Sequence, residues 1–382
     1  MRYCVVGAGF SGAIIARQLA DIGQKVLLID ERQHLAGNCH TERDPETGIM
    51  VHTYGPHIFH TKHKEVWDYI NQYAKIQPFI NRVKAQTQGR IYTLPINLLT
   101  INQFFGTCLR PDEAKEFLKE KADKIITNPK SFEEQALSMV GKELYEAFFK
   151  GYTRKQWGMD PTELPASILK RLPVRFDYDD NYYSDPYQGI PEEGYTPIIE
   201  KIVHHPNIEI RLNCSFESLN EEFDHVFYTG PIDRYFQFKF GRLEYRTLDF
   251  VKNVRDGDYQ GNAVINYCEE KVPYTRVSEY KYFTPWEKDK FTKTIYFEEY
   301  SRLAKENDTQ YYPIRLVNKM DKLQKYLELA KQEKGISFLG RLGTYRYLDM
   351  DAVIKESLEA CRDLVVCLKD KKTIPVFFID AV

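Results

Sequence analysis

Long apolar runs are missing from this chain of 382 residues, and none approaches the roughly 20 residues that a membrane-spanning helix needs. The first apolar strand begins almost at Met1, which leaves no room for a signal peptide. The seven cysteines are odd in number and form no C-x-x-C pair, so reduced thiols explain them better than a disulfide framework or a zinc site. We therefore expect a soluble, cytoplasmic protein.

An excess of charge of either sign is also lacking. Lysine and arginine total 53 against 55 acidic residues, for a net charge of −2, which argues against nonspecific binding to nucleic acid. The sequence shows no internal repeat, no low-complexity stretch and no group of His, Asp and Cys at metal-ligand spacing. We therefore predict no metal site, and the chain offers no paired carboxylates of the glycosidase kind.

The feature that says most about this chain is the segment 5–38, VVGAGFSGAIIARQLADIGQKVLLIDERQHLAGN. An apolar strand runs into G-x-G-x-x-G, then a helix pattern, then a second apolar strand that ends in Asp30. In such a unit Gly7 permits the tight turn, Gly9 lets the backbone approach a pyrophosphate, and Gly12 allows close helix–strand packing. The helix offers its free N–H groups to the phosphates, and Asp30 is placed to accept from a ribose hydroxyl.

The residues after Asp30 favour FAD over NAD. A glycine doublet shortly after the acidic residue is typical of FAD-binding folds, and this chain has Ala36-Gly37-Asn38 at that place. Two later segments fit the same scheme: a strand at 225–228 runs into Thr229-Gly230, and a strand at 336–339 runs into Gly340. A helix pattern from Asp349 to about Leu368 would point its N-terminus toward the middle of the cofactor.

The pattern along the chain predicts an α/β fold whose Rossmann-like FAD-binding domain is discontinuous, with a helical-bundle insertion and an antiparallel β-sheet domain. We assign 1–62, 195–240 and 330–382 to the FAD-binding domain, 63–172 to the helical insertion, and 173–194 with 241–329 to the sheet domain. Helix signals include Pro111 in a first turn, a capping box from Ser131 to Glu134, and a break at Gly141. Period-two patterns at 261–268, 274–283 and 292–300 predict the strands.

Several segments combine arginine with tyrosine or tryptophan, in a chain with 14% aromatic residues. Arginine suits a diphosphate because its planar fork makes paired charge-assisted bonds, and aromatic rings can stack on a base or sugar. A single arginine is more often a surface ion pair, but the combination recurs. It is found in 52–61, 151–158, 163–175, 273–276, 311–315 and 340–349.

These segments, with the N-terminal fingerprint, resemble the bacterial UDP-galactopyranose mutases over almost the whole chain. The most specific are GYTRKQWG at 151–158, LPASILKRLPVRF at 164–176 and GRLGTYRYLDM at 340–350. The resemblance implies a non-redox isomerase that interconverts UDP-galactopyranose and UDP-galactofuranose on reduced, noncovalently bound FAD, by attack of the flavin N5 on the anomeric carbon. It also implies a homodimer that supplies galactofuranose for cell-surface polysaccharide.

The resemblance assigns roles residue by residue. Arg171 and Arg276 match the arginines that neutralise the diphosphate, and Arg171 falls in a region, near 163–174, that matches a mobile lid. The other expected substrate contacts are Tyr311, Tyr312 and Tyr347 for the phosphates, Phe149, Tyr152 and Asn81 for the uracil, Trp157 and Tyr182 beside nucleotide and sugar, and His57 near the sugar.

For the flavin, Arg341 matches an arginine beside cofactor and sugar, and the carbonyl of His60 matches one that accepts from N5–H. With Arg171 and Arg276, these two complete the expected catalytic group. The whole expected cofactor set comprises Gly7, Gly9, Phe10, Ser11, Gly12, Asp30, Glu31, Gly37, Asn38, His57, His60, Thr229, Gly230, Gly340, Arg341, Tyr347, Asp349 and Met350.

Two positions depart from the family pattern. Ala36 replaces a glycine, and its methyl group should be tolerated if its φ is negative. Tyr280 stands where histidine is expected, at a position that we take to be peripheral.

Three other functions remain open. The first is a mutase for TDP-fucopyranose or UDP-N-acetylgalactosamine, and the second is a flavin oxidase or desaturase of the same fold, in which Arg171 and Arg276 would have no purpose. The third is a catalytically silent nucleotide-sugar binder.

Overall fold

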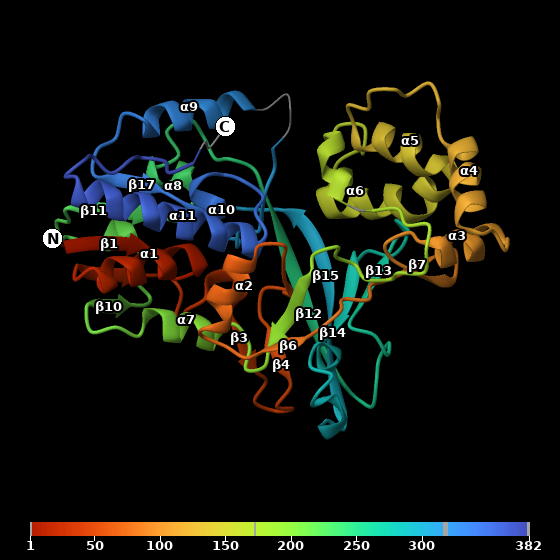
Figure 1. Ribbon diagram of the computed structural model, residues 1–382, viewed down its shortest axis with the longest axis horizontal. Helices are drawn as coiled ribbons and strands as arrows, with labels where there is room; N and C mark the ends of the chain where they lie inside the picture. Colours follow the sequence, from red (N-terminus) through yellow and green to blue (C-terminus); the bar gives the residue numbers. More distant parts are fainter. Residues whose placement is uncertain (1, 172, 316–319, 380–382) are drawn as a thin grey trace.

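The chain folds around a parallel sheet of five strands in the order β10-β2-β1-β11-β17 (Figure 1). The fold is that of a computed structural model, which describes residues 2–171, 173–315 and 320–379. These strands are β1 (Arg2–Val6), β2 (Lys25–Ile29), β10 (Ile208–Arg211), β11 (His225–Tyr228) and β17 (Ile336–Phe338). The sheet therefore joins segments from the two ends and the middle of the chain, and the predicted fold class is confirmed.

Helices cover both faces of this sheet. On one face lie α1 (Phe10–Asp21), α7 (Thr196–Val203) and α11 (Met350–Lys369), which share one apolar core with β1 and β2. A second core on the other face joins α8 (Ile232–Tyr235) and α9 (Met320–Ala330) to β11 and β17. The α1 helix forms because its apolar side chains recur at helical spacing, and Ile14, Ile15 and Leu19 are all buried.

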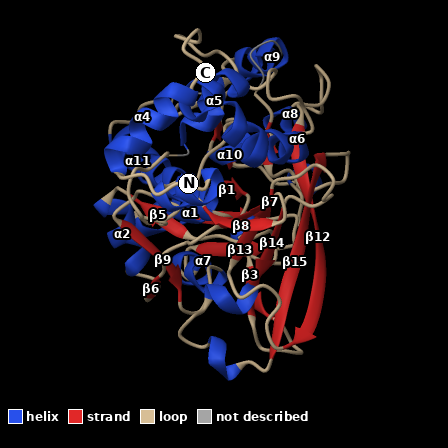
Figure 2. Ribbon diagram, turned by 90° about the vertical axis from the view of Figure 1, so that its right-hand side faces the viewer, coloured by secondary structure: helices blue, strands red, loops and turns tan. Residues whose placement is uncertain are grey.

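A seven-stranded sheet follows in the order β16-β12-β15-β14-β13-β7-β8. All neighbours are antiparallel except β13 and β7, and the long pair β12 and β15 runs along one side of the molecule (Figure 2). The strands are β7 (Lys84–Thr87), β8 (Arg90–Thr93), β12 (Tyr245–Asp256), β13 (Val264–Tyr267), β14 (Arg276–Glu279), β15 (Lys293–Leu303) and β16 (Tyr312–Pro313). The strand expected through Phe283 ends at Glu279, where a 3-10 turn begins.

Two small sheets and a short helix connect these parts. A pair is formed by β3 (Thr41–Arg43) and β4 (Met50–His52), and a three-stranded sheet by β5 (Phe59–Thr61), β9 (Tyr187–Pro191) and β6 (Ile76–Pro78). The α2 helix (Lys64–Asn71) follows β5. The segment at 187–191 therefore pairs with β5 and β6, and does not join the larger antiparallel sheet as we expected of 173–194.

The helical region contains α3 (Leu98–Phe105), α4 (Pro111–Lys121), α5 (Phe132–Leu144), a π-helix at Tyr145–Lys150 and α6 (Gly151–Trp157). The predicted capping box at Ser131 is present, and Gly141 has a φ of 77° that kinks α5. The insertion that we assigned to 63–172 is helical only in part. Residues 84–93 form the hairpin of β7 and β8 instead, because Gln88 and Gly89 both adopt a positive φ and close a tight turn.

Candidate active site

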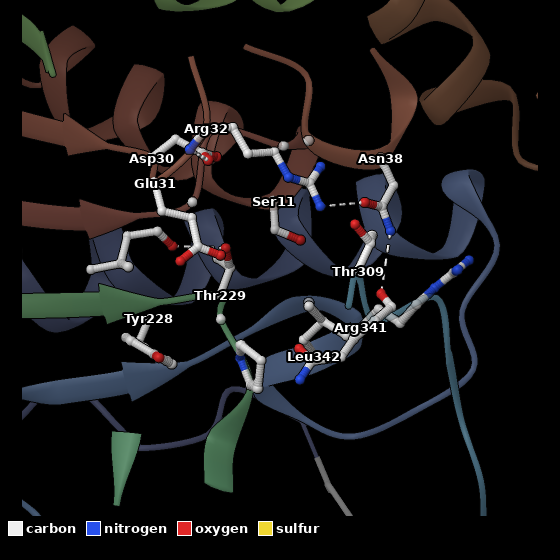
Figure 3. A pocket seen from close by; sticks show the side chains of 18 of the residues that line it. Ser11, Asp30, Glu31, Arg32, Asn38, Tyr228, Thr229, Thr309, Arg341 and Leu342 are labelled. Carbon is white, nitrogen blue, oxygen red and sulfur yellow. Dashed lines mark hydrogen bonds between the residues drawn. The ribbon is translucent and has the colours of Figure 1, made fainter. Parts of the chain in front are cut away.

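A cavity of about 320 Å³ opens at the carboxyl ends of the parallel strands, where a Rossmann-like fold binds its dinucleotide (Figure 3). Residues that follow β1, β2, β11 and β17 meet there because parallel strands bring their ends to one edge. Of the expected cofactor set, the cavity is lined by Gly7, Gly9, Phe10, Ser11, Asp30, Glu31, Gly37, Asn38, His57, Thr229, Gly230, Gly340, Arg341 and Met350. Gly12, His60, Tyr347 and Asp349 do not line it.

The three glycines of the fingerprint differ in what surrounds them. A Cβ at Gly7, whose φ is +100°, would lie 2.1 Å from Oγ1 of Thr229, and a Cβ at Gly12 would lie 1.8 Å from the carbonyl oxygen of Gly7. A Cβ at Gly9 would meet no heavy atom within 4 Å. Gly7 and Gly12 are thus required by the protein's own packing, whereas the space at Gly9 faces the cavity.

The amino end of α1 lines this cavity and contributes a positive electrostatic potential to it. Gly9 is the N-cap and supplies no side chain, and the first turn contains no acidic residue. Asp30 is buried, and its carboxylate accepts the backbone N–H groups of Ala8 at 2.8 Å and Arg32 at 2.9 Å. Asp30 therefore braces the fingerprint loop, in addition to the contact with ribose that its position predicts.

Two groups at the cavity were not identified from the sequence. Arg234 donates to Glu31 at 2.6 Å and to Glu217 at 3.0 Å, and all three residues line the cavity. Arg32 also lines it, and its Nη2 donates to Oδ1 of Asn38 at 2.8 Å. Arg234 and Glu217 are far from Glu31 in the sequence, so no local pattern signals that these three residues meet, whereas Arg32 and Asn38 lie six residues apart in one loop.

The φ of Ala36 is positive, whereas we expected its methyl group to be tolerated only at a negative φ. Its φ is +75°, in the left-handed region that favours glycine, and its side chain is buried in the core of the parallel sheet. The following Gly37 has a φ of +54°, and a Cβ there would lie 3.3 Å from the Cα of Gly9. The loop thus keeps the turn of the glycine doublet although one of its residues carries a methyl group.

A group of residues around Arg276, which we call the Arg276 cluster, brings together several of the expected substrate contacts. The guanidinium of Arg276 interacts electrostatically with Tyr152, Tyr182 and Tyr312, and the rings of Tyr312 and Tyr347 lie 5.3 Å apart. Burial raises the pKa of the Tyr152, Tyr182 and Tyr312 phenols, so these groups stay protonated and can donate hydrogen bonds. One cation and several phenol donors suit an anionic ligand.

Arg276 is held by a carboxylate that sequence reasoning missed. Its Nε donates to Oε1 of Glu299 at 3.0 Å, across directly paired positions of β14 and β15. Glu299 is 2% exposed, and burial raises the pKa of its carboxyl while Arg276 opposes the rise. The pair fixes the guanidinium, and the ionised carboxylate compensates part of its charge.

Arg341 joins the cavity to the Arg276 cluster. It lines the cavity, and its guanidinium donates to the carbonyl oxygens of Leu348 at 2.9 Å and Tyr311 at 3.2 Å. The same guanidinium lies 5.9 Å from the ring centroid of Tyr312 and 5.3 Å from that of Tyr347. A ligand in the Arg276 cluster would therefore lie beside one in the cavity, with Arg341 between them.

Phe149 and Tyr152, two of the expected base-binding residues, lie on either side of the start of α6. Phe149 belongs to the π-helix, a distortion that often marks a functional site, and its ring contacts that of Phe132. Trp157 ends α6 and lies against the core that contains Leu164. Asn81 is 3% exposed, and its Oδ1 has no hydrogen-bond partner among the described residues, so it can accept from a ligand N–H.

The two histidines of the expected cofactor set have different surroundings. Nδ1 of His60 and Oδ2 of Asp185 lie 2.6 Å apart, and the His60 ring stacks on that of Tyr183 at 3.7 Å. His57 lines the cavity, and burial lowers its pKa to about 4, so its ring is neutral at pH 7. Asp349 is the N-cap residue of α11, as predicted, although its side chain makes no capping hydrogen bond.

Tyr280 is not peripheral. It is 1% exposed, and its hydroxyl donates to the carbonyl oxygen of His52 at 3.0 Å. The backbone N–H of His57 in turn donates to Nδ1 of His52 at 2.9 Å, so Tyr280 helps to hold the segment that carries His57. The side chain of Arg171 lies outside what the structure describes, and so does residue 172 of the expected lid.

Across residues 2–171, 173–315 and 320–379, no helix is both long and apolar enough to cross a membrane. Within the same residues, His, Cys, Asp and Glu side chains form no group of three or more that could hold a metal ion.

Comparison with known proteins first defines the class. The profile of NAD(P)-binding Rossmann-like domains matches residues 5–73, which contain the fingerprint and Asp30. The profile described as UDP-galactopyranose mutase matches residues 147–347, which contain the Arg276 cluster. This second match spans more than half of the chain.

Two curated proteins and one solved structure are similar over nearly their full length. The chain is 56% identical to "Probable UDP-galactopyranose mutase" of Klebsiella pneumoniae, over 98% of this chain and 97% of that protein. It is 52% identical to dTDP-fucopyranose mutase of Escherichia coli, over 95% and 97%. A crystal structure of reduced UDP-galactopyranose mutase shares the fold, with a TM-score of 0.73 at 16% identity over 96% of this chain and 95% of that one. The chain belongs to the UDP-galactopyranose mutase family, a family of isomerases.

Proposed function

We propose that this enzyme interconverts UDP-galactopyranose and UDP-galactofuranose with FAD bound in the cavity at the carboxyl edge of the parallel sheet. The observation that carries the proposal is the contact of Arg341 with both the cavity and the aromatic rings of the Arg276 cluster. A dinucleotide site beside a diphosphate site suits a reaction in which a nucleotide sugar meets a flavin. The family membership supports the same reading.

The cavity fits a dinucleotide on three grounds. The space at Gly9 is open, the amino end of α1 is uncapped, and the buried Nη1 of Arg32 has no hydrogen-bond partner among the described residues. When bound and reduced, FAD would supply an electron pair to the anomeric carbon without net oxidation of the sugar. The protein groups of the cavity would bind the phosphates and orient the ring system.

The Arg276 cluster would bind the diphosphate of the substrate and stabilise it as a leaving group. Departure of UDP places negative charge on the phosphate oxygens, and Arg276 with the phenol of Tyr312 would neutralise that charge without a metal ion. The electrostatic interaction between Arg276 and Tyr312 supports this role. We assign Arg171 the same task from the lid, Phe149, Tyr152 and Asn81 to the uracil, and His57 to the sugar. The buried Oδ1 of Asn81 supports the uracil site.

The test compares the two redox states of the flavin. Dithionite-reduced protein should convert UDP-galactofuranose to the pyranose, whereas oxidised protein should not, and equal turnover in both states would contradict the proposal. Arg276→Ala and Arg171→Ala should each remove most of the activity while flavin stays bound, because a lost charge-assisted contact costs about 2–4 kcal/mol. Loss of the yellow colour would mean that these residues bind the cofactor.

A related nucleotide sugar is the second candidate substrate, because the chain is 52% identical to a protein named dTDP-fucopyranose mutase. Relative kcat/KM for UDP-galactose, UDP-N-acetylgalactosamine and TDP-fucose decides between them. We further propose a cytoplasmic homodimer whose product supplies galactofuranose for cell-surface polysaccharide. Sedimentation of the purified protein tests the dimer.

A further inference from the structure

Arg32 is a half-buried cation whose Nη1 atom is fully buried. It follows β2, lines the cavity, and stacks its guanidinium over the ring of Tyr54 at 4.4 Å. Its Nη2 donates to Oδ1 of Asn38 at 2.8 Å, but its buried Nη1 has no acceptor. Within the part of the chain that the structure describes, no carboxylate forms an ion pair with this guanidinium.

Arg234, which lines the same cavity, is an arginine whose positive charge is paired within the protein. It pairs with Glu31 at 2.6 Å and Glu217 at 3.0 Å, so its charge is satisfied by the protein itself. Of the two acids that directly precede Arg32, Glu31 pairs with Arg234, and Asp30 accepts the backbone N–H groups of Arg32 and Ala8. A buried donor left without an acceptor costs free energy, so the Nη1 group of Arg32 indicates an acceptor that a ligand supplies.

A second positive feature faces the same space. The uncapped amino end of α1 contributes its free N–H groups, and Ser11 in its first turn lines the cavity. In Figure 3 the guanidinium of Arg32 extends over the cavity toward Asn38, with Ser11 below it. The helix end and Arg32 therefore act on one region from two sides, which suits a doubly charged anion.

We propose that Nη1 of Arg32 donates a hydrogen bond to the diphosphate of the bound dinucleotide. Asn38 and Tyr54 hold the guanidinium in place, so little side-chain entropy remains to be lost when the ligand binds. Asn38 is itself tied to the opposite wall, because its Nδ2 donates to the carbonyl oxygen of Gln310 at 3.5 Å. This inference rests on the proposed function, since it takes FAD as the dinucleotide.

The test measures ligand binding by the apoprotein. In Arg32→Met the Kd for FAD, followed by quenching of flavin fluorescence, should rise about 10- to 100-fold, the range for loss of a charge-assisted hydrogen bond. Arg32→Lys keeps the charge without the fork and should fall between. Arg362→Met removes an equally positive side chain from an exposed ion pair with Glu65 and should leave the Kd unchanged.

Two smaller probes separate the diphosphate from the rest of the ligand. The Kd of Arg32→Met for ADP should rise by a factor similar to that for FAD, whereas its Kd for adenosine should stay within about twofold of wild type. Equal ADP affinity in the variant and wild type would overturn the inference, and so would an equal loss for adenosine. Thermal unfolding of the apoproteins shows whether the variant is folded, and Arg32→Gln serves as a second neutral variant.

The same measurements distinguish this inference from the function on which it rests. Wild-type apoprotein that binds ADP but not FAD would contradict the proposed flavin, and the ADP comparison would still decide the role of Arg32. Wild-type protein that binds FAD, with Arg32→Met binding both ligands as tightly, would contradict the role of Arg32 alone.

Discussion

Nε of Arg276 and Oε1 of Glu299 lie 3.0 Å apart at directly opposed positions of β14 and β15. This pair shows how the larger sheet shapes the candidate active site. The register of two strands, rather than any local motif, brings an anion to the arginine that we expect to bind the diphosphate. The carboxylate orients the guanidinium and compensates part of its positive charge before substrate binds.

The first prediction concerns Glu299→Gln. The variant keeps the side-chain volume but loses the charge, so we expect kcat/KM for the nucleotide sugar to fall about 10- to 100-fold, the range for a hydrogen bond to a charged group. Glu298→Gln, on the next residue of the same strand, replaces a carboxylate that accepts from the Tyr300 hydroxyl and should change kcat/KM less than twofold. Full activity of Glu299→Gln would show that Arg276 needs no positioning partner.

The second prediction separates two glycines of the fingerprint. Gly9→Ala should fold normally, because a Cβ there meets no protein atom within 4 Å, but its methyl group projects into the proposed ligand space. We expect its affinity for FAD to fall at least about tenfold while the Tm of the apoprotein stays within about 2 °C. Unchanged FAD affinity would place the ligand away from Gly9.

Gly12→Ala provides the contrast. Its Cβ would lie 1.8 Å from the carbonyl oxygen of Gly7, so the apoprotein itself should be destabilised and its thermal transition lowered or lost. The pair of variants thus separates a glycine needed by the ligand from a glycine needed by the fold.

The third prediction is a loss of stability in mild acid. Burial lowers the pKa to about 3 for His52, and to about 4 for His57 and for His225. In the unfolded chain these groups titrate near 6.5, so between pH 6.5 and about 4 the unfolded state binds more protons than the folded state. The free energy of unfolding should therefore fall as pH decreases through this window, by up to about 1.4 kcal/mol per pH unit for each histidine.

Urea denaturation at several pH values between 7.5 and 4.5 measures this slope. His225→Gln removes one of the buried rings, at a site where Nε2 meets Oγ of Ser337 at 2.8 Å, and should reduce the slope by about 1.4 kcal/mol per pH unit. The exposed His204, changed to Gln, should leave it unaltered. A slope that does not respond to His225→Gln would mean that this histidine is not buried as a neutral ring.

The sequence predicted those parts of the fold that local patterns encode. The βαβ unit of β1, α1 and β2, the capping box at Ser131 and the kink at Gly141 all follow from residue types at fixed spacing. The hairpin of β7 and β8 was missed because Gln88-Gly89 lacks the usual Asn-Gly signal, and because β7 pairs with β13, which lies far along the chain.

The candidate site likewise contains some residues that local patterns predict and others that they do not. Gly7, Ser11 and Thr229 could be predicted at the cavity because residues after parallel strands gather at one edge. Arg32 and Glu299 could not, because the buried Nη1 of Arg32 and the pairing of β14 with β15 exist only in the folded chain. The sign of φ at Ala36 was likewise not predictable, since its neighbours in the loop are held by segments distant in sequence.

The last prediction concerns Lys155, which joins α6 to the loop that leads into Arg276. Its Nζ donates to the carbonyl oxygens of Tyr267 at 2.6 Å, Val272 at 2.9 Å and Tyr274 at 2.8 Å. Lys155→Met leaves these carbonyls without that donor, so we expect the loop to open more often and KM for the nucleotide sugar to rise more than kcat falls. Hydrogen exchange of amides 268–275 should quicken, whereas Lys142→Met, at an exposed side chain of α5, should change neither KM nor exchange. Unaltered exchange in Lys155→Met would show that the loop is held by its own strands rather than by the lysine.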